Sequence, residues 1–115
     1  MRDETTTIGS LRDEIARFIQ ERDWEQFHSP KNLSMSITIE AAELMELFQW
    51  MEVDEARTKS QLPEMRGRIE EEIADISIYI LSLCNTLGLD LSACILAKME
   101  KNRGKYPREK CRGKW

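Results

Sequence analysis

Two pairs of acidic residues share one spacing in this sequence. Glu40 and Glu43 form the first pair, and Glu72 and Asp75 form the second, with the members of each pair three residues apart. Residues three apart lie on neighbouring positions of one helix face, so each pair would present its two carboxyl groups together. Carboxylate oxygens are the ligands that Mg²⁺ and Mn²⁺ prefer in proteins. The pairs therefore indicate a divalent-cation site, provided that the two segments meet.

The acidic pairs stand at the edge of apolar stripes rather than opposite them. With Ile37 as the centre of the first stripe, Glu40 falls about 60° away on a helix that turns about 100° per residue. Glu72 holds the same place relative to Ile69, 32 residues further along. If the two stripes pack on each other, all four carboxyl groups converge at one partly buried spot. Without a cation this cluster is costly, because burial and like-charge repulsion both disfavour ionised carboxylates.

Each acidic pair also has a plainer interpretation. Glu is a good helix former, and one such pair taken alone is more typical of a solvated helix face. A di-iron bundle also gathers carboxylates from several helices, but it needs Glu-x-x-His twice. His28 is the only histidine of the chain and lies outside both pairs. A magnesium or manganese site and a solvated acidic face remain as the two interpretations.

Helical patterns position these residues, and no strand alternation persists along the chain. Four helices are expected. The first begins near Ser10, and the second runs from Pro30 to about Gln49. The third runs from Leu62 to a C-cap at Gly88, and the fourth runs from Asp90 to before Pro107. A polar, charged link is expected over residues 52–61. No linker divides the chain, so the sequence predicts a single all-α domain over residues 1–115.

The third expected helix is apolar on more than one side. Its main stripe consists of Ile69, Ile73, Ile76, Ile80, Leu83 and Leu87. Ile78 and Leu81 lie well off that stripe. A helix that is apolar most of the way round is buried on two sides. In a chain this short we expect the second cover to be another subunit, so that oligomerisation completes the core.

Composition argues for a soluble helical protein without a membrane segment. A third of the residues are charged, and no stretch approaches the roughly eighteen apolar residues that a membrane helix needs. The N-terminus, MRDETTTIGS, is polar and does not resemble a signal peptide. Cys84, Cys94 and Cys111 match no metal-binding spacing, and we expect free thiols in a reducing cytoplasm.

Positive charge is concentrated at the C-terminal end. From Lys98 onward, eight Lys or Arg stand against two Glu, a local charge of +6. Residues 1–97 then hold nine basic and nineteen acidic residues, a net charge of −10. The basic end could bind phosphates, while residues 110–115 are expected to be a flexible, solubilising tail. Nucleic acid is an unlikely partner for the acidic body, because such binders rely on an extended basic surface.

Three longer segments resemble a known family. They are RDWEQFHSPKNLSMSITIEAAELMELFQW, EEEIADISIYIL and KMEKNRGKYP, and they resemble the MazG-like all-α nucleoside triphosphate pyrophosphohydrolases, in particular the dCTP pyrophosphatase branch. The likeness covers about residues 8–109 and implies a four-helix MazG-like bundle with its core in that range. It also implies homodimers or homotetramers with active sites at subunit boundaries.

The resemblance implies an enzymatic activity and its metal ligands. Mg²⁺, or alternatively Mn²⁺, would be bound by Glu40, Glu43, Glu72 and Asp75, with one of the four also accepting the proton of the attacking water. Water would attack the α-phosphorus of a nucleoside triphosphate, such as dCTP or a modified pyrimidine deoxynucleotide. The products would be the nucleoside monophosphate and pyrophosphate, which implies a role in cleaning the nucleotide pool.

Aromatic residues are candidates for binding the base and sugar. By the resemblance, Trp24 and Trp50 correspond to aromatics that sandwich the base, Trp50 reaching in from a neighbouring subunit. Stacking of one base on an aromatic ring contributes about 1–3 kcal/mol. Tyr79 follows Asp75 by one turn and could bound the sugar, and His28 could hydrogen-bond base or phosphate. Ordinary packing roles remain the alternative for each of these side chains.

Cations and one amide are candidates for binding the phosphates. They are Lys31, Lys98, Asn102, Arg103 and Lys105. Lys98, Asn102 and Lys105 fall at helical spacing on one side. The segment KNRGKYP resembles a family segment that closes over the triphosphate. Ordinary surface charge is the alternative for each of them.

One residue departs from the family pattern. Vertebrate dCTP pyrophosphatases carry a histidine in the first helix where this chain has Ile15. If that histidine helps to select cytosine, the base preference of this chain is open. The alternative function, from a different class, is a non-catalytic helical oligomerisation or nucleic-acid-binding module that uses the basic C-terminal segment.

Overall fold

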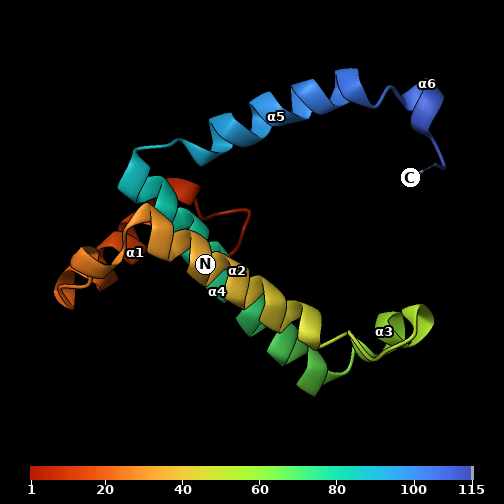
Figure 1. Ribbon diagram of the computed structural model, residues 1–115, viewed down its shortest axis with the longest axis horizontal. Helices are drawn as coiled ribbons and strands as arrows, with labels where there is room; N and C mark the ends of the chain where they lie inside the picture. The colour runs from red at the N-terminus through yellow and green to blue at the C-terminus, as the bar shows by residue number, and fades with distance from the viewer. Residues whose placement is uncertain (115) are drawn as a thin grey trace.

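The computed structural model describes residues 1–114, which form helices and no strand (Figure 1). The elements in chain order are α1 (Ile8–Glu21), the 3₁₀ turn η1 (Glu25–Phe27), α2 (Pro30–Glu46), α3 (Val53–Lys59), α4 (Pro63–Leu87), α5 (Leu91–Lys105) and α6 (Arg108–Cys111). The predicted all-α fold is confirmed. The four expected helices correspond to α1, α2, α4 and α5.

Several helix ends follow the local signals in the sequence. The Ser29 hydroxyl caps α2 by accepting a hydrogen bond from a backbone N–H of its first turn at 3.1 Å. Asp90 caps α5 in the same way at 2.9 Å. Gly88 ends α4 with a φ of 68°, a left-handed conformation that glycine adopts without steric cost. The predicted C-cap at Gly88 is confirmed.

Other boundaries differ from the prediction. α1 begins at Ile8 rather than near Ser10, because the Thr7 hydroxyl accepts a hydrogen bond from the Ser10 N–H at 3.0 Å and so caps the helix earlier. α2 ends at Glu46, three residues before the predicted end, and turns follow it. The predicted link contains α3. Its acidic first turn and basic last turn both complement the helix dipole, but it has no buried residue.

The basic C-terminal end continues beyond α5 and contains one further short helix. Residues 108–111 form the short helix α6, so the first part of the predicted 110–115 tail is helical. Trp115 lies outside the described residues.

α2 and α4 form the central pair of the fold, packing side by side in opposite directions while α1 crosses α4 (Figure 1). Their contact creates a small core. Its buried side chains are Ile19 of α1, Leu33 of α2, and Leu81, Ser82 and Cys84 of α4. The core therefore lies at the end of α4 where the three helices meet, and the acidic pairs lie further along the α2–α4 interface.

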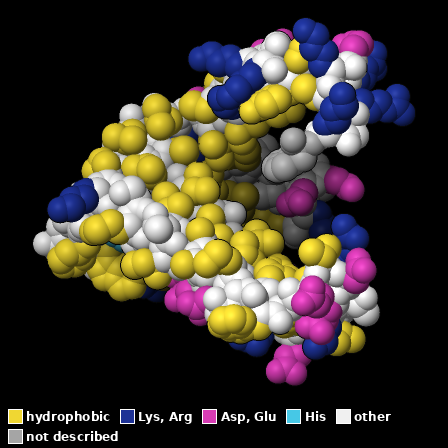
Figure 2. All heavy atoms as spheres, turned by 45° about the vertical axis from the view of Figure 1, so that its right-hand side comes forward, with side chains coloured by type: hydrophobic (Ala, Val, Ile, Leu, Met, Phe, Trp, Pro, Cys, Tyr) yellow, Lys and Arg dark blue, Asp and Glu magenta, His cyan; other side chains and the backbone are white. Residues whose placement is uncertain are grey.

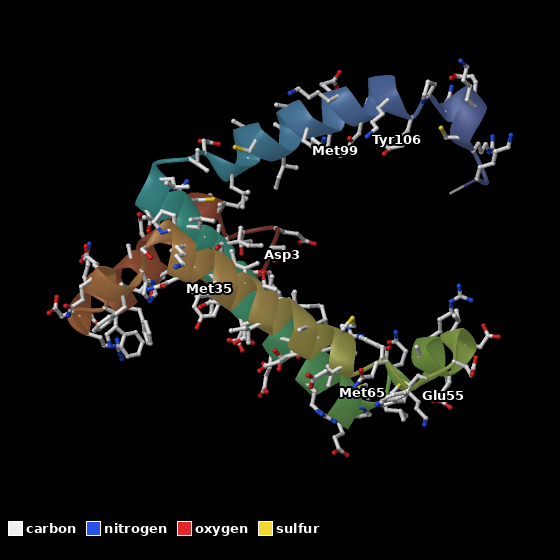
Figure 3. All side chains as sticks on the ribbon, viewed as in Figure 1. Asp3, Met35, Glu55, Met65, Met99 and Tyr106 are labelled. Atoms are coloured by element: carbon white, nitrogen blue, oxygen red, sulfur yellow. The ribbon has the colours of Figure 1, made fainter. Side chains whose placement is uncertain are left out.

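α5 stands apart from the central pair (Figure 1). It contributes no buried residue, and the side chains of Met99 and Tyr106, labelled in Figure 3, are 43% and 55% exposed. The Cα radius of gyration is 17.2 Å, against about 13 Å for a compact chain of this length. Figure 2 shows hydrophobic side chains along the hollow between the α5–α6 arm and the rest of the molecule, with Lys and Arg gathered on that arm. The chain alone thus leaves much apolar surface uncovered.

Within residues 1–114, no single helix is both long and apolar enough to span a membrane. α4 and α5 meet those criteria of length and composition only as a pair, which is bent by 102°.

Candidate active site

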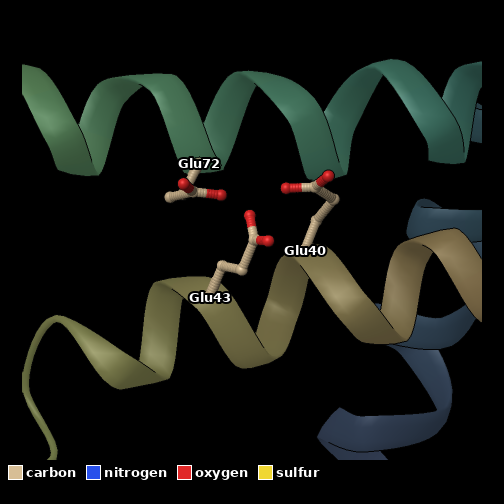
Figure 4. A group of neighbouring side chains, drawn as sticks. All are labelled: Glu40, Glu43 and Glu72. Carbon is tan, nitrogen blue, oxygen red and sulfur yellow. The ribbon is translucent and has the colours of Figure 1, made fainter.

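The side chains of Glu40, Glu43 and Glu72 meet between α2 and α4 (Figure 4). One carboxylate oxygen from each residue lies within 4.8 Å of those of the other two. Glu40 and Glu43 share one face of α2 because they are one helical turn apart, and Glu72 faces them from the antiparallel α4. The packing of the two apolar stripes therefore brings three of the four predicted ligands together.

Burial makes this acidic group unusual. Glu40 and Glu72 are half-buried, and within the described residues Oε2 of each is buried without a hydrogen-bond partner. Burial, together with the facing carboxyl groups of Glu43 and Glu72, raises the pKa of Glu40 to about 7. Burial and the neighbouring acids Glu43 and Asp75 also raise the pKa of Glu72. The group is thus destabilised when ionised, and it has no cationic partner among residues 1–114.

Asp75 lies at one end of this acidic group. Its charge contributes to the raised pKa values of both Glu40 and Glu72, so it is electrostatically coupled to the group. Its side chain also lines an adjacent cavity with Tyr79 and Ile78, one turn further along α4. Asp75 thus connects the acidic group to that cavity.

The adjacent cavity has a volume of about 430 Å³ and mainly apolar walls, and we call it the aromatic cavity. It lies between α1, α4 and the turn that follows α1. Its lining residues are Glu14, Ile15, Phe18, Ile19, Trp24, His28, Asp75, Ile78 and Tyr79. The rings of Trp24 and Phe18 form a T-shaped pair at a centroid distance of 5.9 Å, and the Arg22 guanidinium covers the Phe18 ring at 3.7 Å. These contacts fix an aromatic wall that a flat apolar ligand could contact.

A polar cavity opens at the other end of the acidic group. It has a volume of about 320 Å³, and its lining residues are Glu43, Glu46, Leu47, Gln49, Arg68, Glu71 and Glu72. Arg68 is its only cationic side chain and forms no ion pair within the described part of the chain. Along α4, Arg68, Glu72, Asp75 and Tyr79 follow at spacings of four, three and four residues, so they share one face. The polar cavity, the acidic group and the aromatic cavity therefore follow one another along α4.

A comparison with known protein families assigns the chain to one of them. A family model described as the MazG-like family matches residues 35–114, a range that contains all four predicted metal ligands. The chain belongs to the MazG-like family. A crystal structure of a pyrophosphatase from Archaeoglobus fulgidus is similar to the MazG-like chain over 93% of this chain and 98% of that one, with 39% sequence identity and a TM-score of 0.82.

Curated relatives of the MazG-like chain are named dCTP pyrophosphatase 1. The bovine protein is 41% identical over 107 residues, which is 93% of this chain and 63% of that protein. The human protein is 41% identical over 101 residues, which is 88% of this chain and 59% of that protein. The chain therefore spans about three-fifths of the length of these relatives.

The candidate base-binding residues are separated in this MazG-like chain. Trp24 and Tyr79 both line the aromatic cavity, whereas Trp50 follows α2 and is 90% exposed outside it. His28 lines the aromatic cavity and a second cavity of about 480 Å³ that also includes Ser82. In the described structure, Nδ1 of His28 is buried without a hydrogen-bond partner.

The candidate phosphate-binding residues do not line either cavity beside the acidic group. Lys31 is exposed in the first turn of α2. Lys98, Asn102, Arg103 and Lys105 are carried by α5, which stands apart from the α2–α4 pair. Lys105 contacts the Tyr106 ring at 5.3 Å, and Arg103 pairs with Glu100. Within one chain, none of these five residues is brought to the acidic group.

Several residues that line the site were not predicted from the sequence, and Phe18, Glu14 and Arg68 are three of them. Phe18 and Glu14 enter the aromatic cavity from α1, and Arg68 enters the polar cavity from α4. Arg68 carried a usable signal, because it precedes Glu72 by one helical turn. Glu14 and Phe18 carried none, because their position depends on how α1 crosses α4.

Proposed function

We propose that this chain is a Mg²⁺-dependent nucleoside triphosphate pyrophosphohydrolase that converts dCTP, or a modified pyrimidine deoxynucleotide, to the monophosphate and pyrophosphate. The observation that carries the proposal is the group of half-buried Glu40 and Glu72 with exposed Glu43, between an aromatic and a polar cavity. Membership of the MazG-like family and the names of the relatives support the same reaction.

The acidic group fits a hard divalent cation. Glu40 and Glu72 each have a buried oxygen that, in the described residues, lacks a donor, and a cation would supply the missing partner. Oxygen ligands without histidine or cysteine suit Mg²⁺ or Mn²⁺ better than Zn²⁺. We assign Glu40, Glu43, Glu72 and Asp75 as the ligands. When bound, the ion would neutralise phosphate charge and lower the pKa of a bound water.

The two cavities suggest how the substrate lies. The base would occupy the aromatic cavity against Trp24, with Tyr79 beside the sugar, because this cavity alone of the two offers flat apolar walls. The β- and γ-phosphates would lie in the polar cavity, where Arg68 provides a guanidinium. The α-phosphate would then lie at the acidic group, between the two cavities.

The carboxylates would also provide the general base that accepts the proton of the attacking water. A general base must hold a pKa near the working pH and lie within hydrogen-bond reach of that water. Glu40, Glu43, Glu72 and Asp75 all adjoin the place proposed for the ion, and a bound cation favours the ionised form of each. One of them would accept the proton, with the others fixing the position of the water.

The exposed residues support a site completed by a second subunit. Trp50 and the basic face of α5 do not reach the acidic group of their own chain, and much apolar surface is uncovered. In a symmetric dimer or paired dimer, each chain could supply these groups to its neighbour. We propose that Trp50, Lys98, Asn102 and Lys105 act on the substrate of the neighbouring subunit, with Lys31 as a further candidate for binding phosphate.

We also propose a cytoplasmic location. Cys84, Cys94 and Cys111 are free thiols. Free thiols persist in a reducing compartment, which supports the proposal.

Hydrolysis in ¹⁸O-labelled water tests the reaction. With dCTP and Mg²⁺ we expect dCMP and pyrophosphate, with the label in dCMP, because water attacks the α-phosphorus. Glu43→Gln should reduce turnover by about two orders of magnitude or more while the helical circular dichroism is unchanged. The control is Glu70→Gln, since Glu70 only pairs with Arg66 at 3.4 Å on the surface.

Two outcomes would overturn the proposal. A fully active Glu43→Gln variant would contradict the assignment of Glu43 as a ligand of the cation. Salt-dependent binding of oligonucleotides without hydrolysis of any nucleoside triphosphate would favour the alternative, a non-catalytic nucleic-acid-binding or oligomerisation module.

A further inference from the structure

The turn between α4 and α5 determines where the α5–α6 arm points. It consists of residues 88–90, and the two helices that it joins are bent by 102°. Among residues 1–114, no side-chain hydrogen bond or ion pair joins α5 to another helix, and α5 has no buried residue. Figure 1 shows the arm leaving the rest of the chain at this turn. The direction of α5 within one chain is therefore set at the turn.

A small change at this turn becomes a large displacement at the far end of α5. At about 1.5 Å per residue, Lys105 lies about 21 Å along the helix axis from Leu91. A tilt of about 10° at the turn would move Lys105 by about 4 Å, which exceeds the length of a hydrogen bond. Binding of a phosphate group by side chains on α5 therefore depends on how firmly the turn is held.

Arg12 of α1 holds this turn through two hydrogen bonds. Its Nη1 donates to the Leu89 carbonyl at 2.6 Å, and its Nε donates to Oδ1 of Asn85 at 2.8 Å. The Asn85 amide donates back to the Arg12 carbonyl at 3.1 Å. Because the guanidinium is planar and its donors are fixed relative to one another, it fixes the Leu89 carbonyl relative to the last turn of α4.

The Leu89 carbonyl stands at the junction of the two helices. The N–H of Leu89 donates to the Cys84 carbonyl at 2.9 Å and so belongs to the end of α4. The next residue, Asp90, caps α5 through its side chain. Arg12 and Asn85 are both half-buried, so their hydrogen bonds compete less with water than exposed ones do. Arg12 thus connects α1, the end of α4 and the start of α5.

We propose that Arg12 is a positioning residue for the reaction, because it holds the turn that aims α5 at the active site of the neighbouring subunit. The inference rests on the proposed function, in which Lys98, Asn102 and Lys105 act on the substrate of a neighbour. Arg12 lines neither the aromatic nor the polar cavity. It acts through α5 of its own chain, and hence on the site of the other chain.

The kinetic constants for dCTP give the first test. Arg12→Ala should raise KM about tenfold and change kcat by less than about twofold, because phosphate binding is weakened while the acidic group is unaltered. Loss of folded protein would instead lower kcat and leave KM unchanged. Arg12→Lys should give a KM between those of wild type and Arg12→Ala, since an ammonium group donates hydrogen bonds but lacks the planar fork.

Arg17→Ala is the matched control for these constants. Arg17 is also on α1, pairs with Glu14 at 3.1 Å on the surface and lines neither cavity beside the acidic group. Its KM and kcat should equal those of the wild-type protein.

Mixed assemblies test whether Arg12 acts on the neighbouring site. Arg12→Ala and Glu43→Gln chains are unfolded and refolded together in equal amounts and assayed at a dCTP concentration far below KM. In a mixed dimer, the acidic group of the Arg12→Ala chain meets α5 of the Glu43→Gln chain, which keeps Arg12. Activity should reach about a quarter of the wild-type value for random dimers, against about a twentieth if Arg12 acts within the site of its own chain.

The results separate two failures. Activity of the mixture near a twentieth of the wild-type value, or wild-type kinetic constants in Arg12→Ala, would overturn this inference while the proposed reaction stands. If the wild-type protein released no pyrophosphate from any nucleoside triphosphate, the proposed function would fall, and this inference with it.

Discussion

The carboxyl groups of Glu40 and Glu72 face each other from α2 and α4, and each keeps a buried oxygen that no donor within the described residues reaches (Figure 4). Two acids at a helix interface would normally be placed apart or paired with cations, because their ionisation is penalised by burial and by each other. Here both pKa values are raised. The pair is therefore a local cost to stability that a bound cation would remove.

The first prediction concerns pH and metal. The ordinary pKa of Glu40, 4.5, applies to the unfolded chain, and the folded value is about 7. Between these values the folded chain binds more protons, so its free energy of unfolding falls as pH rises. This contribution is fully present below about pH 4.5 and is lost as pH rises through about 7. Mg²⁺ binds the ionised group, so it should raise the melting temperature clearly near pH 8 and little near pH 5.

Glu40→Gln provides the comparison for this prediction. Its neutral amide removes the titration, so in EDTA the difference in stability between variant and wild type should grow as pH rises from 5 to 8. The Mg²⁺-dependent rise in melting temperature near pH 8 should shrink as well. An equal Mg²⁺ effect at both pH values in the wild type would contradict the assignment.

The second prediction concerns Arg68 and the leaving group. Arg68 is the only cation of the polar cavity, so its loss should weaken the binding of the β- and γ-phosphates. For Arg68→Ala we expect kcat/KM for dCTP to fall about ten- to a hundredfold, the range for one hydrogen bond to a charged group.

Arg66→Ala is the control for this measurement. Arg66 lies two residues away on α4, pairs with Glu70 and is outside the cavity. It should behave as the wild type. If the two variants lose activity equally, the effect comes from the helix and not from a phosphate contact.

The central pair of helices and its acidic group could be predicted because one helical period determines them. The spacing of Glu40 and Glu43 puts both on one face of α2, and the apolar stripe beside them fixes which face packs on α4. Local chemistry likewise predicted the cap at Gly88. For these features, which neighbours in the chain determine, the structure agrees with the sequence, whereas the local cap at Thr7 was not predicted.

The features of the fold and site that were not predicted depend on contacts between distant segments or on weak local signals. α3 has seven residues and no buried side chain, so no apolar stripe indicated it. The place of Glu14 follows from how α1 crosses α4, which the sequence does not encode in any one segment. The separation of α5 from the α2–α4 pair was likewise not predicted, because the family resemblance implied one four-helix bundle.

The third prediction tests whether residues act across subunits. If Trp50 completes the site of a neighbour, an assembly of Glu43→Gln and Trp50→Ala chains contains some sites with both wild-type residues. Neither variant alone has such a site. When the two are unfolded and refolded together in equal amounts, activity with dCTP should recover to about a quarter of the wild-type value for random dimers.

The control for complementation pairs Glu43→Gln with Glu72→Gln. Both residues belong to one acidic group of the same chain, so mixed assemblies contain no intact site and activity should stay low. Recovery of activity in the mixture of Glu43→Gln and Glu72→Gln, or no recovery in the mixture of Glu43→Gln and Trp50→Ala, would show that Trp50 does not complete the site of a neighbouring subunit.

The last prediction concerns the attachment of α1. Arg12 donates hydrogen bonds to Oδ1 of Asn85 at 2.8 Å and to the Leu89 carbonyl at 2.6 Å, and the Asn85 amide donates back to the Arg12 carbonyl at 3.1 Å. These bonds hold α1, the wall that carries Glu14, against the end of α4. Arg12→Ala should lower the free energy of unfolding by about 1–3 kcal/mol, measured by urea denaturation.

Hydrogen exchange and a double mutant distinguish this attachment from a general loss of packing. In Arg12→Ala, backbone amides of α1 should exchange faster while those in the middle of α4 keep their protection. Arg12→Ala and Asn85→Ala should not be additive, because each removes part of the same set of bonds. Arg17→Ala should change stability by less than about 0.5 kcal/mol, since its exposed pair with Glu14 contributes little. Additive effects, or unchanged exchange in α1, would mean that apolar contacts such as those of Ile19 hold the helix without Arg12.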